Sequence, residues 1–199
     1  MATWLVVGLG NPGPTYASHR HNVGAMVIAE LARRGGVTLS AHRLQRANTA
    51  VVRVGASGTG AVGADTERVL LATTRTYMNE SGSPVVKLLA HDKISPDHLV
   101  VVHDELDLDF GRIRTKFGGG DNGHNGLKSI RSAIGTGDYY RVRWGISRPP
   151  GRQDPADYVL SGFPKAMADD LAVEVSRAAD AVECLVTQGL DATQQRFNS

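Results

Sequence analysis

The apolar residues of this chain follow two patterns, short continuous runs and stripes at helical spacing. The short runs are typical of buried strands and lie at residues 4–7, 47–54, 68–72, 99–102, 112–117 and 140–146. The second and third runs flank a glycine-rich segment, so we expect them to form an antiparallel hairpin. Because the other runs alternate with helical segments, the pattern predicts a mixed sheet rather than a purely parallel one.

Four helical stripes predict helices between these strands and near the end of the chain. They begin after Asn22, at Ser83, at Asn125 and near Met167, and the last one is long and stops at Gly189. Asn22 and Ser83 are expected to cap their helices, whereas residues 149–151, Pro-Pro-Gly, should break regular structure. We therefore predict a single α/β domain over residues 1–199, with a twisted mixed β-sheet flanked by helices and a long C-terminal helix.

Composition is that of a folded protein without disulfides. Hydrophobic residues make up 41% of the chain and charged residues 21%, a balance that is unlike that of disordered chains. The apolar run at residues 4–7 is too short for a signal peptide or a membrane span, so we expect a cytoplasmic protein. Cys184 is the only cysteine, which excludes an intramolecular disulfide, and we expect it to pack within a helix.

Charge is unevenly distributed, although the net charge is only +2. Between Arg112 and Arg152 the chain has nine Lys or Arg residues against two acidic ones, Asp121 and Asp138. Such an excess can attract phosphate groups at long range. A solvated basic face is the commoner explanation, so charge alone does not identify a nucleic-acid partner.

The segment from Gly8 to Gly13, Gly-Leu-Gly-Asn-Pro-Gly, has the spacing of the glycine fingerprint of dinucleotide-binding folds and follows a predicted strand. That fingerprint requires a helix that opens inside the glycine run, whereas Pro12 and Pro14 lack amide protons and delay any helix. We therefore expect no nicotinamide cofactor. We interpret these glycines as letting the backbone approach a substrate closely while presenting the Asn11 amide.

A histidine and a carboxylate stand at two predicted loop edges. His21 precedes the first helix, where an imidazole can face a cleft and titrate near neutral pH, although a surface histidine would show the same pattern. Asp104 follows a buried strand, at the end where α/β folds place ligand sites. A carboxylate there could orient a histidine from elsewhere and stabilise the imidazolium that forms when the histidine takes a proton.

A metal centre and a serine nucleophile are the chemical alternatives. The possible metal ligands lack a recognised spacing such as His-Glu-x-x-His, and they are His19, His21, His103, Asp104 and Glu105. No Gly-x-Ser-x-Gly elbow occurs in the chain. We therefore expect water as the attacking group and no metal.

Two glycine-flanked polar turns, residues 77–82 and 118–126, contain Asn79 and Asn125. Each turn alone is ordinary turn chemistry. Amide groups that converge on a cleft could hold a water and a carbonyl in line and stabilise a developing oxyanion. Sequence spacing does not show whether these two side chains meet.

Five ordered motifs resemble those of the bacterial peptidyl-tRNA hydrolases. They are GLGNPG at residues 8–13, RHN at 20–22, MNESG at 78–82, HDELD at 103–107 and DNGHNGL at 121–127. The resemblance covers nearly the whole chain. It implies hydrolysis of the ester between a peptide and the terminal ribose of tRNA, which recycles tRNA from aborted translation. It also implies a monomer that needs no cofactor, metal or protein partner.

The resemblance further implies roles for individual residues. His21 matches the catalytic base, and Asp104 matches the carboxylate that stabilises its proton-accepting form. Asn11 matches the position that separates N-blocked peptidyl-tRNA from free aminoacyl-tRNA. The tRNA-contacting positions, at which the asparagines would also orient water and the ester carbonyl, are Tyr16, Tyr77, Met78, Asn79 and Asn125. Lys116 and Arg143 match the pair that grips the 5′ phosphate of tRNA.

Overall fold

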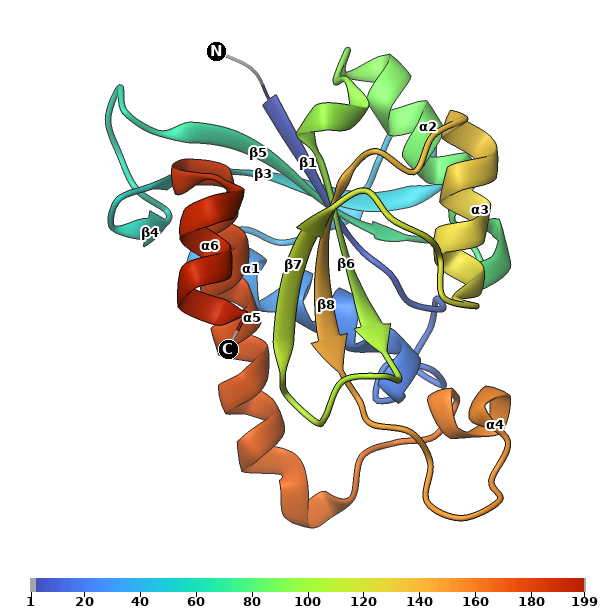
Figure 1. Cartoon of the computed structure of the whole chain (residues 1–199). Helices are drawn as coiled ribbons and strands as arrows, with labels where there is room; N and C mark the ends of the chain where they lie inside the picture. The colour runs from blue at the N-terminus through green and yellow to red at the C-terminus, as the bar shows by residue number, and fades with distance from the viewer. Residues whose placement is uncertain (1–2, 199) are drawn as a thin grey trace.

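One twisted β-sheet runs through the centre of the molecule, with helices on both of its faces (Figure 1). The computed structural model describes residues 3–198. The strands are β1 (Thr3–Gly8), β2 (Ser40–Ala41), β3 (Ala47–Gly55), β4 (Gly58–Thr59), β5 (Glu67–Thr74), β6 (Leu99–Glu105), β7 (Ile113–Phe117) and β8 (Tyr140–Gly145). Their order is β2-β3-β5-β1-β6-β8-β7, and β4 pairs with β3.

The sheet combines parallel and antiparallel pairs, as predicted. β1 runs parallel to both β5 and β6, and β6 runs parallel to β8. β3 and β5 form the expected antiparallel hairpin, and β7 adds an antiparallel edge strand to β8. Because β1 and β6 are parallel neighbours, the segments that follow their carboxyl ends meet at one edge of the sheet.

The helices form two layers. They are η1 (Arg20–Asn22), α1 (Val23–Arg34), η2 (Met78–Glu80), α2 (Gly82–His91), η3 (Pro96–His98), α3 (Asn125–Ile134), α4 (Pro155–Val159), η4 (Lys165–Met167), α5 (Ala168–Gln188) and α6 (Leu190–Phe197). α2 and α3 pack together on one face, and α1 and α5 pack together on the other (Figure 1). Alternate residues of β1 serve the two layers, since Leu5 and Val7 join the core under α2 and α3 while Val6 joins the core under α1 and α5.

Several boundaries differ from the sequence prediction. α4 was not predicted, because residues 149–151, Pro-Pro-Gly, indicate a break in regular structure. The helix starts at a good capping residue, Asp154, whose side chain accepts the backbone N–H of Ala156. Gly189 ends α5, as predicted, but the chain immediately forms α6. Cys184 is buried within α5, which confirms the packing role. No helix within residues 3–198 is long and apolar enough to cross a membrane.

The two predicted helix caps are wrong. Asn22 stands at the start of α1 but makes no capping hydrogen bond, because its side chain is bound to the backbone of Asn11. α2 begins at Gly82, so Ser83 lies inside the helix. The hydroxyl of Ser81, the residue before α2, donates to the carbonyl oxygen of Met78 instead of capping.

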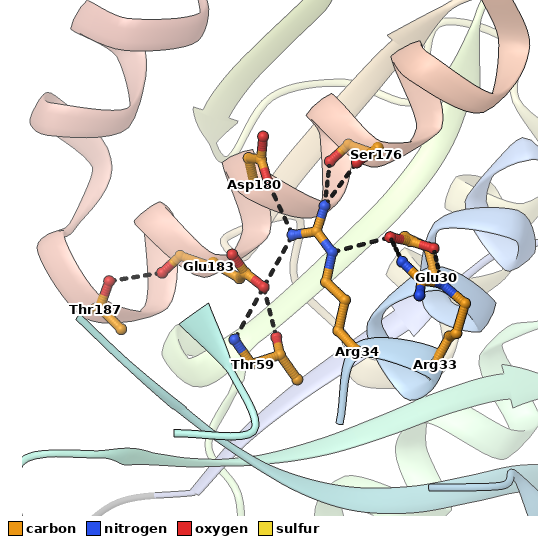
Figure 2. Close-up of polar contacts among 8 residues, drawn as sticks. All are labelled: Glu30, Arg33, Arg34, Thr59, Ser176, Asp180, Glu183 and Thr187. Carbon is orange, nitrogen blue, oxygen red and sulfur yellow. Dashed lines mark hydrogen bonds and ion pairs between the residues drawn. The ribbon is translucent and has the colours of Figure 1, made fainter. Parts of the chain in front are cut away.

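Arg34, at the end of α1, fastens this helix to α5, and Glu183 of α5 in turn binds Thr59 of β4 (Figure 2). Its guanidinium donates to Asp180 at 2.8 Å and to Glu183 at 3.0 Å, and it also donates to both oxygens of Ser176. A fifth hydrogen bond reaches Glu30, one turn back on α1. All three guanidinium nitrogens therefore have partners, and these partners hold the pKa of Arg34 above its ordinary value although burial lowers it.

Candidate active site

His21 and Asp104 meet at the edge of the sheet where β6 ends. Asp104 is the next-to-last residue of β6, and η1 places His21 beside it. The Nδ1 atom of His21 lies 2.8 Å from Oδ2 of Asp104, and both side chains are buried. Because a carboxylate only accepts, Nδ1 carries the proton and Nε2 keeps a lone pair. Nε2 makes no hydrogen bond with any residue from 3 to 198, so it is available as a base.

The pair has the electrostatics of a histidine that takes up a proton. Burial lowers the pKa of His21, but the charge of Asp104 and its hydrogen bond outweigh burial and raise that pKa above its ordinary value. Burial would raise the pKa of Asp104, yet His21 and His124 hold it well below its usual range. Asp104 is therefore an anion that stabilises an imidazolium at His21.

His124 is a second partner of Asp104. Its Nε2 atom lies 2.7 Å from Oδ1 of Asp104, and its Nδ1 atom accepts the backbone N–H groups of Gly126 and Leu127 at the start of α3. This fixes the proton on Nε2, the tautomer opposite to that of His21. His124 thus caps α3 and ties it to Asp104. We assigned it no role from the sequence, although its place directly before a predicted helix is the position of a cap.

His103, the third histidine near Asp104, is not a candidate base. Its side chain is buried, Nδ1 contacts the carbonyl oxygen of Asp104 at 2.9 Å, and burial lowers its pKa to about 3. The metal set considered from the sequence does not assemble either. Within residues 3–198, the ligand atoms that converge here belong to His21, Asp104 and His124, without His19 or Glu105. Hydrogen bonds already join those atoms to one another.

The glycines after β1 bring α1 close to the sheet. A Cβ atom at Gly8 would lie 2.1 Å from the carbonyl oxygen of Gly24, and one at Gly24 would lie 2.2 Å from that of Val102. Gly10 makes room for the side chain of Asn22. These contacts correct our interpretation, since at these positions the close approach serves helix packing rather than a substrate. They also hold η1, and with it His21, against the end of β6.

Asn11 is held in place by three hydrogen bonds. Its backbone N–H and carbonyl oxygen both bind the side chain of Asn22, and its Oδ1 atom accepts the backbone N–H of Met78 at 2.7 Å. The backbone amide of Asn11 is therefore not presented to a substrate. The side-chain NH2 group has no hydrogen-bond partner among residues 3–198, which leaves it as a donor in a fixed position.

A cavity of about 170 Å³ lies beside the two histidines. One side is polar and includes His21, Asp104, His124 and Asn125, whereas the other side is formed by apolar residues of the α4 region and by Leu106. Asn125 thus lies beside the histidine pair, a proximity that the sequence spacing could not show. Asn79 does not, because it is exposed on η2 and makes no hydrogen bond with the described residues. Its neighbour Met78 is buried instead.

Two further pairs of side chains are those that the resemblance assigns to tRNA contacts. Lys116 on β7 and Arg143 on β8 lie on the same face of neighbouring strands, and Arg143 contacts Glu105 at 3.3 Å. Lys116 has no ion-pair partner within residues 3–198, and burial together with nearby arginines lowers its pKa. Tyr16 and Tyr77 form an edge-to-face ring pair 6.1 Å apart, and Tyr77 is exposed.

Comparisons with known proteins identify the family of this chain. The chain matches the family model described as peptidyl-tRNA hydrolase over residues 5–199. It is 58% identical to the peptidyl-tRNA hydrolase of Cutibacterium acnes over 99% of this chain and 98% of that protein, and 54% identical to that of Frankia alni over 98% and 94%. A crystal structure of the Acinetobacter baumannii peptidyl-tRNA hydrolase superposes with a TM-score of 0.86 at 32% identity, covering 99% of this chain and 95% of that one. The chain therefore belongs to the peptidyl-tRNA hydrolase family.

Proposed function

We propose that this protein hydrolyses the ester bond between a peptide and the 3′-terminal ribose of tRNA, with His21 as the base that activates water. The observation that carries the proposal is that His21 lines the cavity and that Asp104 binds its Nδ1 atom, while its Nε2 atom has no hydrogen-bond partner within residues 3–198. Family membership supports peptidyl-tRNA as the substrate.

The reaction needs one proton to move twice. His21 removes a proton from water through Nε2 as the water oxygen attacks the ester carbonyl, and Asp104 stabilises the resulting imidazolium. When the tetrahedral intermediate collapses, the bond from carbon to the ribose 3′ oxygen breaks, and the imidazolium gives its proton to that oxygen. The products are a free peptide acid and tRNA with its 3′ hydroxyl restored.

Asparagine side chains are the proposed donors to the developing oxyanion. Asn125 borders the same cavity as His21 and is the proposed donor, whereas Asn11 lines a neighbouring cavity, where its fixed side-chain NH2 group is proposed to separate N-blocked peptidyl-tRNA from free aminoacyl-tRNA. Fixed donors stabilise a transition-state charge without having to reorganise. The role for Asn79 stays a prediction from the resemblance alone, since a rotation of its exposed side chain would be required.

Contacts to tRNA are proposed at the sheet edge and at the tyrosine pair. Lys116, which has no ion-pair partner within residues 3–198, suits the 5′ phosphate together with Arg143, because a phosphate accepts charge-assisted hydrogen bonds from both cations. The ring of Tyr77, with Tyr16 behind it, offers a surface on which a terminal base can stack. We further propose that the protein acts in the cytoplasm as a monomer and needs no cofactor.

The test is release of an N-blocked amino acid from acylated tRNA in the presence of a chelator. Unblocked aminoacyl-tRNA and the His21→Ala variant are the controls. Release from the blocked substrate that depends on His21 and resists the chelator would support the proposal. Tight tRNA binding without release would instead indicate a tRNA-binding module with an inactive cleft, and loss of activity with the chelator would favour a metal at His21, Asp104 and His124.

A further inference from the structure

The apolar side of the cavity belongs to a segment that leaves the body of the protein. After β8 the chain extends outward, forms α4 and returns to α5, and α4 stands apart from the main layers of helices (Figure 1). Pro155, Ala156 and Val159 of α4 nevertheless line the same cavity as the histidines. The shape of the cavity therefore depends on how this segment is attached.

Arg20 provides an attachment directly beside His21. Its Nη1 atom donates to the carbonyl oxygen and hydroxyl of Ser161, at 3.2 and 2.7 Å, and to the carbonyl oxygen of Gly162 at 2.7 Å. Its backbone N–H donates to the carbonyl oxygen of Ser161 at 3.0 Å, and His19 forms a β-bridge with Gly162. The turn that carries the proposed base is thus bound to the end of the α4 segment.

Aromatic contacts strengthen this attachment. The guanidinium of Arg20 lies over the ring of Tyr158 at 4.1 Å and over that of Phe163 at 5.2 Å. Tyr158 is buried, and its hydroxyl donates to the carbonyl oxygen of Ile146 at 2.6 Å. The N–H of Ile146 in turn donates to the carbonyl oxygen of Glu105, the residue after Asp104. The same segment is therefore linked to both members of the histidine and aspartate pair.

The start of the segment is held more weakly. Arg148 pairs with Asp107 at 2.6 Å, but its side chain is 59% exposed, and exposed ion pairs contribute little to stability. Arg20, by contrast, donates to three oxygens through Nη1 while its planar guanidinium lies over two aromatic rings, and a lysine could keep some of the hydrogen bonds but not the planar stacking. Arg20 is not among the residues that line the cavity, so it does not meet the substrate there.

We propose that Arg20 is a positioning residue, which holds α4 against the turn carrying His21 and so fixes both the apolar side of the cavity and the approach of His21 to Asp104. This inference rests on the proposed hydrolysis of peptidyl-tRNA. A misplacement of about 1 Å of a reacting group can reduce a rate by about a hundredfold, so a remote clamp of this kind can matter for turnover.

The experiment compares Arg20→Gln and Arg20→Lys with Arg33→Gln, a control on the exposed face of α1, where the one ion-pair partner of Arg33 among residues 3–198 is Glu30. Three quantities are measured for each protein: kcat and KM for an N-blocked acyl-tRNA, the affinity for deacylated tRNA, and the hydrogen exchange of backbone amides in residues 155–162.

Arg20→Gln is expected to lower kcat/KM by about tenfold to a hundredfold and to speed exchange in residues 155–162, while exchange in β6 and α5 stays as in the wild type. Arg20→Lys should be intermediate, and Arg33→Gln should match the wild type. The affinity for deacylated tRNA should not change, because Lys116 and Arg143 lie on β7 and β8.

Two outcomes would overturn the inference. One is wild-type kcat/KM and exchange in Arg20→Gln. The other is faster exchange throughout the chain with normal turnover per folded molecule, which would make Arg20 an ordinary stabilising residue. If the wild type itself released no amino acid, the proposed function would fail, while the exchange data would still report whether Arg20 holds α4.

Discussion

Two clusters of charged side chains in this molecule use the same kinds of hydrogen bond and differ in what they leave free. In the cluster around Arg34, the guanidinium is surrounded by Glu30, Asp180 and Glu183, and the donors are all occupied (Figure 2). In the cluster around Asp104, both carboxylate oxygens are occupied by histidines, but Nε2 of His21 has no partner within residues 3–198.

This difference separates a cluster that holds the fold from one that can do chemistry. Native proteins satisfy nearly all buried polar groups, so a fixed group without a partner beside a cavity marks a place for a ligand or a reacting atom. The Arg34 cluster joins α1, β4 and α5 and offers nothing further to a ligand. The Asp104 cluster holds His21 and His124 by one hydrogen bond each, and within residues 3–198 it leaves Nε2 of His21, a residue that lines the cavity, without a partner.

The largest expected effect is the loss of activity in His21→Ala. Removing the base should lower the rate by about a hundredfold to ten-thousandfold, measured as single-turnover release from N-blocked acyl-tRNA. His21→Asn is the matched variant, because its amide can still donate to Asp104 while it cannot act as the base. Thermal unfolding should show that His21→Asn remains folded. Turnover at the wild-type rate in either variant would show that the free nitrogen is not the reacting group.

Asp104→Asn should change both the rate and its dependence on pH. The charge of Asp104 raises the pKa of His21, and a base works only above its own pKa, so the acid limb of the kcat/KM profile should move to lower pH in the variant. The maximal rate should fall, because the imidazolium loses its anion and the productive tautomer is no longer favoured. The measurement is kcat/KM from about pH 5 to 9. An unmoved acid limb would mean that Asp104 does not tune the base.

Arg34→Met should show the opposite behaviour, a loss of stability without a loss of turnover. The side chain of Arg34 is 18% exposed, and its removal leaves carboxylates of α1 and α5 unpaired, so we expect a loss of about 2 kcal/mol in the free energy of unfolding. Arg33→Met, on a side chain that is 72% exposed, should leave the free energy of unfolding close to that of the wild type. Urea unfolding measures both. A fall in kcat per folded molecule of Arg34→Met would break the separation of the two clusters.

The sequence predicted the scaffold well because its signals are local. Short apolar runs identified the six longer strands, and the glycine-rich segment between two of them identified the hairpin of β3 and β5. The caps at Asn22 and Ser83 were wrong because a side chain that can cap can also serve a distant partner, and for Asn22 the backbone of Asn11 is that partner. Which partner a polar side chain chooses is settled by tertiary contacts.

The site residues likewise divide into those that the sequence motifs identify and those whose role depends on contacts across the fold. His21 and Asp104 could be paired from the resemblance, and their contact then needed only that η1 lies at the end of β6. The second histidine on Asp104 was missed, because His124 acts through a cap and a contact formed across the fold. For Asn79 the motif matched the family, but the side chain is exposed and does not line the cavity.

The smallest effect is expected for Lys116. Like Nε2 of His21, the charged group of Lys116 has no partner, since it forms no ion pair among residues 3–198. If such groups mark ligand contacts, Lys116→Gln should weaken tRNA binding by about tenfold at low salt and reduce the dependence of affinity on salt by about one released ion. Lys87→Gln, an exposed change on α2, alters the net charge equally and should leave both quantities unchanged. Binding titrations with deacylated tRNA at several salt concentrations test this. Equal effects of the two changes would mean that Lys116 acts only through the net charge of the protein. A loss of affinity confined to tRNA that carries a 5′ phosphate would place that phosphate at Lys116.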